Sequence, residues 1–125
     1  MVMGTEARRI LIVDGHAEIR NGIRSLLKPW PQMQVVAEAA TGIEALNIAR
    51  STAPDIAIMD LSLPGFHGIE LIRALNRDSP ETRLLIYTIY RSKLLAREAL
   101  NAGARFYVVK GDPSSDLLAA LIGCR

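Results

Sequence analysis

The stretch Ile10-Leu11-Ile12-Val13-Asp14 sets the fold of this chain. Its first four residues are leucine or β-branched and run together without a polar interruption, which favours a strand that is buried on both faces. Such strands occur in parallel sheets that carry helices on both sides. The following Asp14-Gly15 indicates a turn at the end of the strand. This stretch therefore predicts the first strand of a parallel α/β sheet.

The same alternation of strand and helix continues along the chain. Apolar residues recur at a spacing of three and four after each buried run, as on one face of an amphipathic helix. We expect strands at 10–13, 33–38, 55–60, 83–87 and 106–109, and helices at 17–28, 41–51, about 69–75, 92–101 and from Ser114 or Ser115 onward. Parallel neighbours need crossover helices, so we predict a five-stranded, doubly wound α/β fold with helices on both faces.

Local signals mark several helix ends. Thr41 and Glu44 have the spacing of a capping box, in which each side chain satisfies a backbone N–H group of the first helical turn. Pro29 ends the first helix, and Gly103 fits a left-handed cap position after the fourth. Ser114 or Ser115 is expected to cap the last helix.

Composition is typical of one globular domain. The chain has 125 residues, a hydrophobic fraction of 50% and a formal net charge of +2, so no strong field draws the whole molecule to nucleic acid. The single cysteine, Cys124, excludes an internal disulfide and favours an intracellular compartment. Without a long apolar run or a signal peptide, we expect a cytoplasmic domain with no membrane contact. We assign 9–122 to this domain, 1–8 to an N-terminal extension and 123–125 to a tail where an output domain has been cut away.

Polar residues follow four of the expected strands. Asp14 follows the first, Asp60 ends the third, Thr88 follows the fourth and Lys110 follows the fifth. In open parallel sheets the ligand crevice lies beyond the carboxyl ends of the strands, so these side chains should converge. Two acids about 4 to 5 Å apart repel by roughly 3 to 4 kcal/mol at an effective dielectric constant near 20, and Lys110 or Mg²⁺ can offset that. A polar strand end that satisfies nearby backbone is the simpler interpretation of each residue alone.

Several motifs resemble, in order and spacing, those of the CheY-like receiver family of two-component response regulators. They are Ile10-Leu-Ile-Val-Asp14, Ile58-Met-Asp-Leu-Ser-Leu-Pro64 with Gly68, Tyr87-Thr88 and Tyr107-Val-Val-Lys110. Finer features look most like receivers of the NarL/LuxR group of transcriptional regulators; these are Asp14-Gly-His16, Arg20, Pro54-Asp55 and Gly103-Ala104. The resemblance implies the strand order 2-1-3-4-5.

The resemblance also implies a function. Asp60 would accept a phosphoryl group from a sensor histidine kinase, Lys110 and Thr88 would bind phosphate oxygens, and Tyr107 would act as a switch. The domain would not be an enzyme, beyond slow self-dephosphorylation. It would act on a partner or as a homodimer, and would reach DNA only through a C-terminal output domain outside this chain.

The magnesium site departs from the family pattern. The resemblance implies that Asp14, Asp60 and the backbone carbonyl of Ser62 hold Mg²⁺, but the second of two adjacent acids after the first strand is Gly15 here. Such a change typically costs about 10-fold to 100-fold in affinity or activity. We therefore expect a slow or metal-impaired receiver, and Ile89 after Thr88 would further hinder access. The alternative is a degenerate receiver that serves as a phosphorylation-independent interaction or dimerisation module.

Two enzyme or cofactor classes are disfavoured. A haloacid dehalogenase-like phosphatase would need an acid at Ser62, and a flavin or nucleotide binder would need a phosphate loop where Asp14 stands. His16 and His67 are interpreted as a helix-start residue and a loop residue, not as metal ligands. Trp30 is expected to cover the end of the first helix. The expected fourth helix carries candidates for a partner surface, which are equally a solvated face: Arg91, Lys93, Leu94, Leu95 and Arg97.

Overall fold

The computed structural model describes residues 7–124 and contains a five-stranded parallel sheet. Its strands are β1 (Arg8–Val13), β2 (Met33–Ala39), β3 (Ile56–Met59), β6 (Arg83–Thr88) and β7 (Phe106–Val109). They lie in the order β2-β1-β3-β6-β7, and every neighbouring pair is parallel. The predicted order 2-1-3-4-5 of the main strands is confirmed, and so is the fold class.

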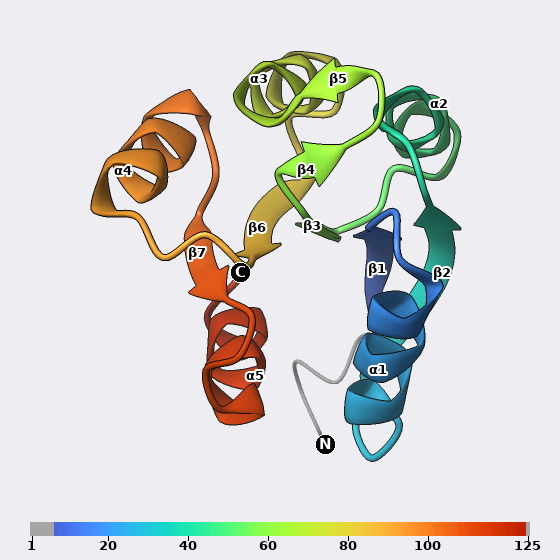
Figure 1. The fold of residues 1–125 in the computed structure, drawn as a ribbon. Helices are drawn as coiled ribbons and strands as arrows, with labels where there is room; N and C mark the ends of the chain where they lie inside the picture. Colours follow the sequence, from blue (N-terminus) through green and yellow to red (C-terminus); the bar gives the residue numbers. More distant parts are fainter. Residues whose placement is uncertain (1–6, 125) are drawn as a thin grey trace.

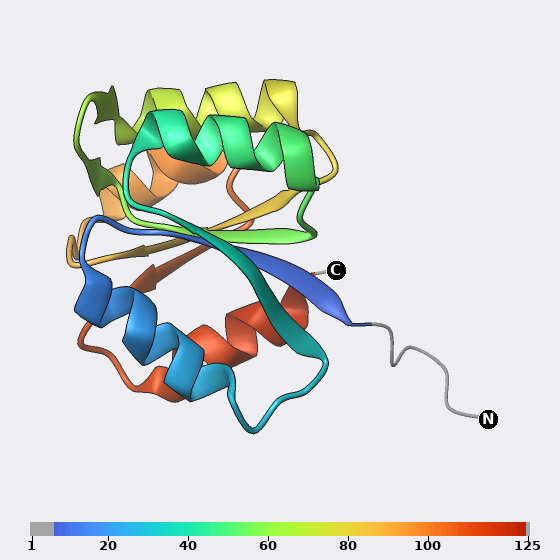
Figure 2. The ribbon, with the colours of Figure 1, turned by 90° about the vertical axis from the view of Figure 1, so that its right-hand side faces the viewer.

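Helices cover both faces of the sheet. They are α1 (Ala17–Leu27), α2 (Gly42–Thr52), α3 (Gly68–Asp78), α4 (Lys93–Ala102) and α5 (Ser114–Gly123). Figure 1 shows α2, α3 and α4 on one side of the sheet and α1 and α5 on the other. Figure 2 shows the same layers from the side. The sheet therefore separates two hydrophobic cores.

The central strand β1 explains why its sequence is apolar without interruption. Leu11 and Val13 pack in the core beneath α2, α3 and α4, whereas Ile10 and Ile12 pack in the core against α1 and α5. All four side chains are fully buried. Alternate side chains of a strand point to opposite faces, so a strand covered on both sides needs apolar residues at every position.

A short hairpin replaces part of the expected loop after the third main strand. β4 (Ser62–Leu63) pairs antiparallel with β5 (Phe66–His67), and Gly65 turns between them with a φ of 75°. Gly68 then starts α3 against Leu61, whose backbone oxygen would lie 2.6 Å from any Cβ at position 68. This close contact requires glycine and ties the hairpin to the residue after Asp60.

The predicted helix ends are partly right. Thr41 caps α2 by accepting a hydrogen bond from the Glu44 backbone N–H, but the Glu44 carboxylate accepts from Ala40 and not from the Thr41 backbone. Gly103 follows α4 with the expected positive φ. The expected serine cap of α5 is wrong: Pro113 occupies the cap position and no side chain caps there.

The two ends of the described chain contact each other. Arg8, the first residue of β1, donates from Nη1 to the backbone oxygens of Leu121 and Cys124. Gly123 is still helical, and Cys124 is buried in the core beneath α1 and α5. Arg8, Gly123 and Cys124 are therefore part of the folded unit, although the sequence interpretation placed them in an extension and a tail. Among residues 7–124 no helix is long and apolar enough to cross a membrane.

Candidate functional site

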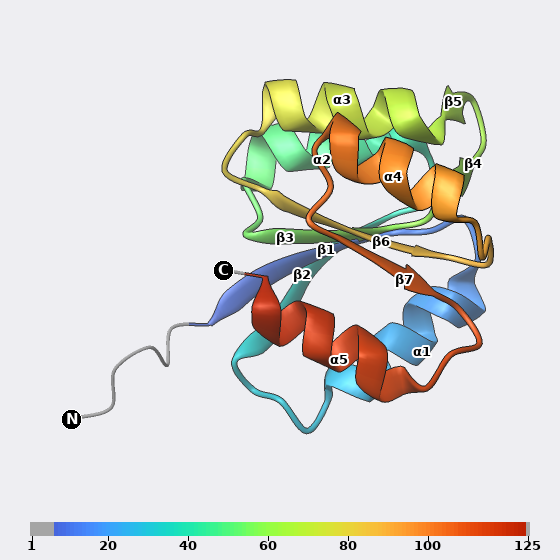
Figure 3. The same ribbon diagram turned by 90° about the vertical axis from the view of Figure 1, so that its left-hand side faces the viewer.

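The carboxyl ends of four strands bring the expected polar residues to one edge of the sheet. Figure 3 shows the arrowheads of β6 and β7 pointing to the side where the β4–β5 hairpin lies. The backbone ladder continues past the strand ends, because Asp60 N–H donates to Val13 at 2.9 Å and Lys110 N–H donates to Thr88 at 2.7 Å. Main-chain hydrogen bonds thus fix the backbone positions of Asp60 and Lys110.

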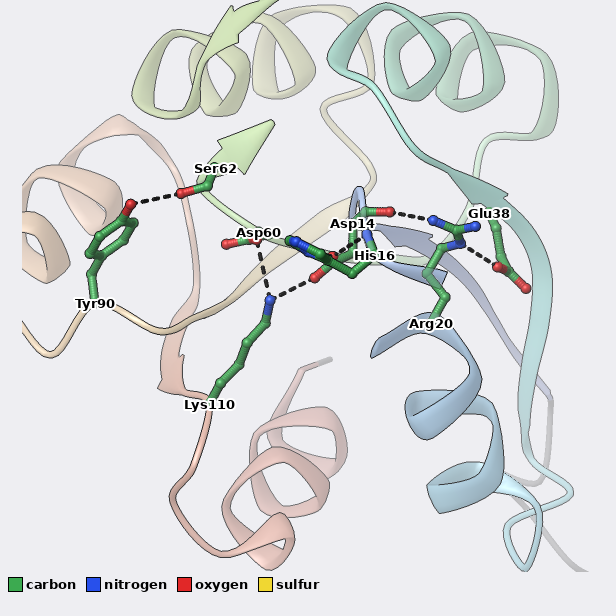
Figure 4. Close-up of polar contacts among 8 residues, drawn as sticks. All are labelled: Asp14, His16, Arg20, Glu38, Asp60, Ser62, Tyr90 and Lys110. Carbon is green, nitrogen blue, oxygen red and sulfur yellow. Dashed lines mark hydrogen bonds and ion pairs between the residues drawn. The ribbon is translucent and has the colours of Figure 1, made fainter. Parts of the chain in front are cut away.

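Lys110 bridges the two acids. Its Nζ lies 2.7 Å from Asp14 Oδ2 and 3.2 Å from Asp60 Oδ2, as Figure 4 shows. The side chains of both acids are 4% exposed and that of Lys110 is 10% exposed. Such a buried pair of carboxylates repels strongly unless a cation joins them. The three charges leave the edge with a net charge of −1, so it still attracts a cation.

Two buried polar atoms at this edge have no hydrogen-bond partner within residues 7–124. They are Asp60 Oδ1 and Thr88 Oγ1. An unsatisfied buried polar group costs about 1 to 3 kcal/mol, so such groups need a physical explanation. Thr88 ends β6 opposite Val109, next to the strand that carries Lys110. An oxygen-rich ligand or a cation at this edge would satisfy both atoms.

The donor set fits a divalent cation. Ligand atoms of Asp14, His16 and Asp60 all lie within 4.8 Å of one another, and hard cations prefer carboxylate oxygen. The unpartnered Asp60 Oδ1 is the atom that remains available, since Lys110 contacts the other oxygen. Ser62 lies in β4 beside this cluster (Figure 4), and its predicted use of a backbone carbonyl stays a prediction.

His16 is closer to this chemistry than the sequence interpretation allowed. It occupies the cap position of α1, as expected for a helix-start residue, but its side chain makes no capping bond. Its ring Nδ1 instead lies 3.0 Å from Asp14 Oδ1, and its backbone N–H donates to the same oxygen at 2.8 Å. The interpretation of His16 as a helix-start residue alone was therefore incomplete. The signal for it is the two-residue spacing from Asp14 across a tight turn.

Gly15 is not required by the backbone or by space. It is not among the glycines with positive φ, and a Cβ there would meet Ala40 O at 3.6 Å and Pro64 Cδ at 3.9 Å, which are ordinary contacts. A Cβ would therefore fit at this position. Neither the backbone conformation nor the available space therefore explains the glycine. Its consequence is chemical, because the site has one carboxylate fewer.

A second residue that sequence reasoning did not assign to the site is Arg20. It donates from Nη1 to the backbone oxygen of Asp14 and from Nε to Glu38 Oε1, both at 2.7 Å. Glu38 also accepts from Arg24, and this contact is the main reason that the pKa of Glu38 lies below its usual range. Arg20 thus anchors the turn that carries Asp14 and His16 to the end of β2 (Figure 4).

The expected switch residue is linked to the hairpin. Tyr107 is half-buried on β7 and donates its hydroxyl proton to the backbone oxygen of Tyr90. The Tyr90 hydroxyl in turn accepts from Ser62 Oγ at 3.0 Å. Burial, and secondarily the negative charge of Asp60, raises the pKa of Tyr107, so the hydroxyl stays protonated and can donate. A chain of contacts therefore runs from the loop after Asp60 to Tyr107.

The candidate partner surface is exposed over α4. Leu94 is 64% exposed, and Arg91 forms an ion pair with Asp112 that joins the loops before α4 and α5. His67 is exposed at the cap position of α3, as expected for a solvated residue, but it lies in β5 of the hairpin and not in an irregular loop. Trp30 packs on the core beside α1, as expected.

Comparison with known proteins identifies the class to which this fold and site belong. The sequence profile of the response regulator receiver domain matches residues 10–122. The chain is 36% identical over 110 residues to the uncharacterized transcriptional regulatory protein YhcZ of Bacillus subtilis (strain 168), covering 88% of this chain and 51% of that protein. It is 33% identical over 116 residues to the nitrate/nitrite response regulator protein NarL of Escherichia coli (strain K12), covering 93% and 54%.

Solved structures agree. The crystal structure of a two-component response regulator of the LuxR family from Aurantimonas sp. SI85-9A1 matches with a TM-score of 0.89 at 40% identity, over 94% of this chain and 84% of that one. This chain belongs to the receiver domains of response regulators, and within them it is of the NarL/LuxR type. It spans about half the length of the curated relatives described above.

Proposed function

We propose that this receiver accepts a phosphoryl group on Asp60 from the phosphohistidine of a sensor kinase. The observation that carries the proposal is the buried Asp60 carboxylate, which has Lys110 at one oxygen and, in the part of the chain that the structure describes, no partner at the other. An oxygen of Asp60 would form the new bond to phosphorus while the bond from phosphorus to the imidazole nitrogen breaks. The electron pair of that broken bond returns to the imidazole, and the product is an aspartyl phosphate.

The neighbouring side chains would stabilise the transferred group. Lys110 can move its ammonium from the carboxylates to a phosphate oxygen, since it is a compact charge on a flexible stem. Thr88 Oγ1 can donate to another oxygen, which would satisfy a group that is now buried without a partner. Mg²⁺ held by Asp14, Asp60 and the Ser62 carbonyl would supply positive charge to the phosphoryl oxygens.

The proposed output is a change in the surface around α4, β7 and α5. The contacts from Ser62 through Tyr90 to Tyr107 give a route by which movement of the loop after Asp60 reaches that surface. Local charge changes of this kind bias a two-state element. In the whole protein we propose regulation of transcription through an output domain, because the relative YhcZ is named a transcriptional regulatory protein. The domain itself acts as a phosphoacceptor, not as an enzyme on other substrates, and a homodimer is one candidate readout.

Intact-mass measurement after incubation with acetyl phosphate and Mg²⁺ tests the proposal. The wild-type chain should gain one phosphoryl group, and Asp60→Asn should gain none. Asp116→Asn is the matched control, because it removes an exposed acid from the first turn of α5 and should react like wild type. Size-exclusion chromatography of the same samples reports whether modification changes the oligomeric state.

The second candidate is a phosphorylation-independent interaction module, and Gly15 is the observation that favours it. The two functions differ in one measurement. No mass gain in the wild-type chain at saturating acetyl phosphate and Mg²⁺, with the fold intact, would reject phosphoacceptance and leave this second function.

A further inference from the structure

We propose that His16 replaces the missing acid of the metal site as a nitrogen ligand, and that the site therefore prefers a borderline transition-metal ion such as Zn²⁺ to Mg²⁺. The ligand set is Asp14, His16 and Asp60, whose donor atoms cluster within 4.8 Å. The proposal concerns the same edge as the proposed function, but it does not require that phosphoryl transfer occurs.

The geometry of the Asp14–His16 turn supports shared ligation. Asp14 Oδ1 and His16 Nδ1 are 3.0 Å apart. Two ligands of a tetrahedral Zn²⁺ ion, each about 2.0 to 2.1 Å from the metal, are themselves about 3.3 to 3.4 Å apart, so a small turn of the ring would bring both atoms to one ion. The His16 side chain is 63% exposed and makes no capping bond, so its ring can turn toward an ion without disturbing the core.

A second observation points into the same cluster. Asp60 Oδ1 is buried and has no partner within residues 7–124, whereas the Oδ2 atoms of both acids contact Lys110. Lys110 therefore occupies the Oδ2 side of the carboxylate pair. On the other side Asp14 Oδ1 contacts His16, and Asp60 Oδ1 remains for a cation. Backbone bonds hold the main chain of both acids, and the contacts with Lys110 and the His16 N–H hold their carboxylates, so the oxygens are positioned before an ion arrives.

The charge and the type of the ligands determine which ion binds more tightly. Asp14, Asp60 and Lys110 sum to −1, and an acid at position 15 would have made the sum −2. Mg²⁺ depends on anionic oxygen ligands and is bound poorly by imidazole. Zn²⁺, Co²⁺ and Ni²⁺ accept imidazole nitrogen readily. Exchanging a carboxylate for an imidazole thus weakens Mg²⁺ binding more than Zn²⁺ binding.

Competition titrations with a chromogenic chelator test this on the untagged chain, without any phosphodonor. Zn²⁺ and Mg²⁺ affinities are measured for wild type, His16→Gln and His67→Gln. His67 is the matched control because it is the only other histidine in the sequence and is also exposed at a helix cap position. Since carboxylates alone also bind Zn²⁺, the decisive quantity is the change between variants.

His16→Gln should weaken Zn²⁺ binding at least about 10-fold and change Mg²⁺ binding by less than about twofold, while His67→Gln should match wild type. Gly15→Asp should act in the opposite sense and tighten Mg²⁺ at least about 10-fold. In the Co²⁺-loaded chain, proton NMR should show the His16 ring resonances shifted far from their diamagnetic positions.

Equal Zn²⁺ affinity of wild type and His16→Gln would overturn the inference. So would an equal loss in His67→Gln, which would mean adventitious binding to surface histidine. A chain that binds Zn²⁺ as expected but is not modified by acetyl phosphate would support this inference and reject the proposed function, so the two failures are distinguishable.

Discussion

The two halves of the site differ in how closely they follow the receiver pattern. The half built by β3, β6 and β7 retains the acid, the hydroxyl and the amine of the family, in Asp60, Thr88 and Lys110. The half built by β1 and the start of α1 retains Asp14 but has Gly15 and His16 after it. In the proposed function, the first half would bind the phosphoryl group and the second would mainly bind the cation. The difference indicates that phosphate chemistry and metal choice are separable in this fold.

Removing Lys110 should have the largest effect on the phosphate half. Lys110→Ala takes away the only ammonium that contacts Asp14 and Asp60 within the described residues. Loss of one preorganised charge donor typically costs about 100-fold to 1,000-fold in rate. We expect that loss in the initial rate of modification by acetyl phosphate, followed by intact mass. Lys93→Ala, on the exposed start of α4, should leave the rate unchanged; an equal loss there would contradict the assignment.

Placing an acid at position 15 should strengthen Mg²⁺ binding in the half of the site built by β1 and the start of α1. Gly15→Asp adds a Cβ that meets only ordinary contacts, and it should lower the Mg²⁺ concentration that half-saturates modification by about 10-fold to 100-fold. The matched control is Gly22→Asp, which adds the same charge at an open, exposed position of α1. If both variants shift the Mg²⁺ requirement equally, the effect is general electrostatics and the two halves are not separable.

Removing the hydrogen bond between Ser62 and Tyr90 should have a smaller effect, which is measured on the free energy of unfolding. Tyr90→Phe and Ser62→Ala each remove the hydrogen bond that joins the hairpin to the β6–α4 loop. An exposed neutral hydrogen bond contributes about 1 kcal/mol or less. A double-mutant cycle by urea unfolding should show a coupling energy of about 0.5 kcal/mol. Additive losses would mean that the two hydroxyls do not interact in solution.

A small effect is also expected from the pH dependence of the Glu38 ion pairs with Arg24 and Arg20. Glu38 has a lowered pKa in the folded chain, chiefly because Arg24 donates to it and also because Arg20 does. Its ion pairs therefore stabilise the fold above the ordinary pKa of 4.5, and this contribution is lost as the pH falls through the folded value. Glu38→Gln should be less stable than wild type by about 1 kcal/mol or less near neutral pH. Urea unfolding should show the gap closing in acid; a constant gap would exclude this ionic origin.

The fold was predictable because its signals are long and local. Ile10–Val13 and the other buried runs are continuous, and helical spacing follows each of them, so the order of elements and the class of sheet followed from sequence. The hairpin at Ser62–His67 was missed because strands of two residues have no readable periodicity. The Pro113 cap was missed because serine is the stronger statistical signal at a helix start.

The site was predictable to the extent that strand ends determine it. Asp14, Asp60, Thr88 and Lys110 follow from the rule that ligands bind beyond the carboxyl ends of parallel strands. The Asp14–His16 contact depends on the angle of one turn, and the Arg20–Glu38 pair joins residues that are 18 positions apart. Such contacts between side chains have no local pattern, so they required the three-dimensional structure.

The hydrogen bonds from Arg8 to the end of α5 join the first strand of the domain to its last helix. Arg8 supplies donors to carbonyl groups 113 and 116 positions later in the chain, at a helix terminus whose last carbonyl groups lack helical partners. The last turn of α5 is thus completed by a residue of the first strand, β1. Removing the Arg8 side chain would therefore loosen the end of α5, although Arg8 and that helix lie at opposite ends of the domain sequence.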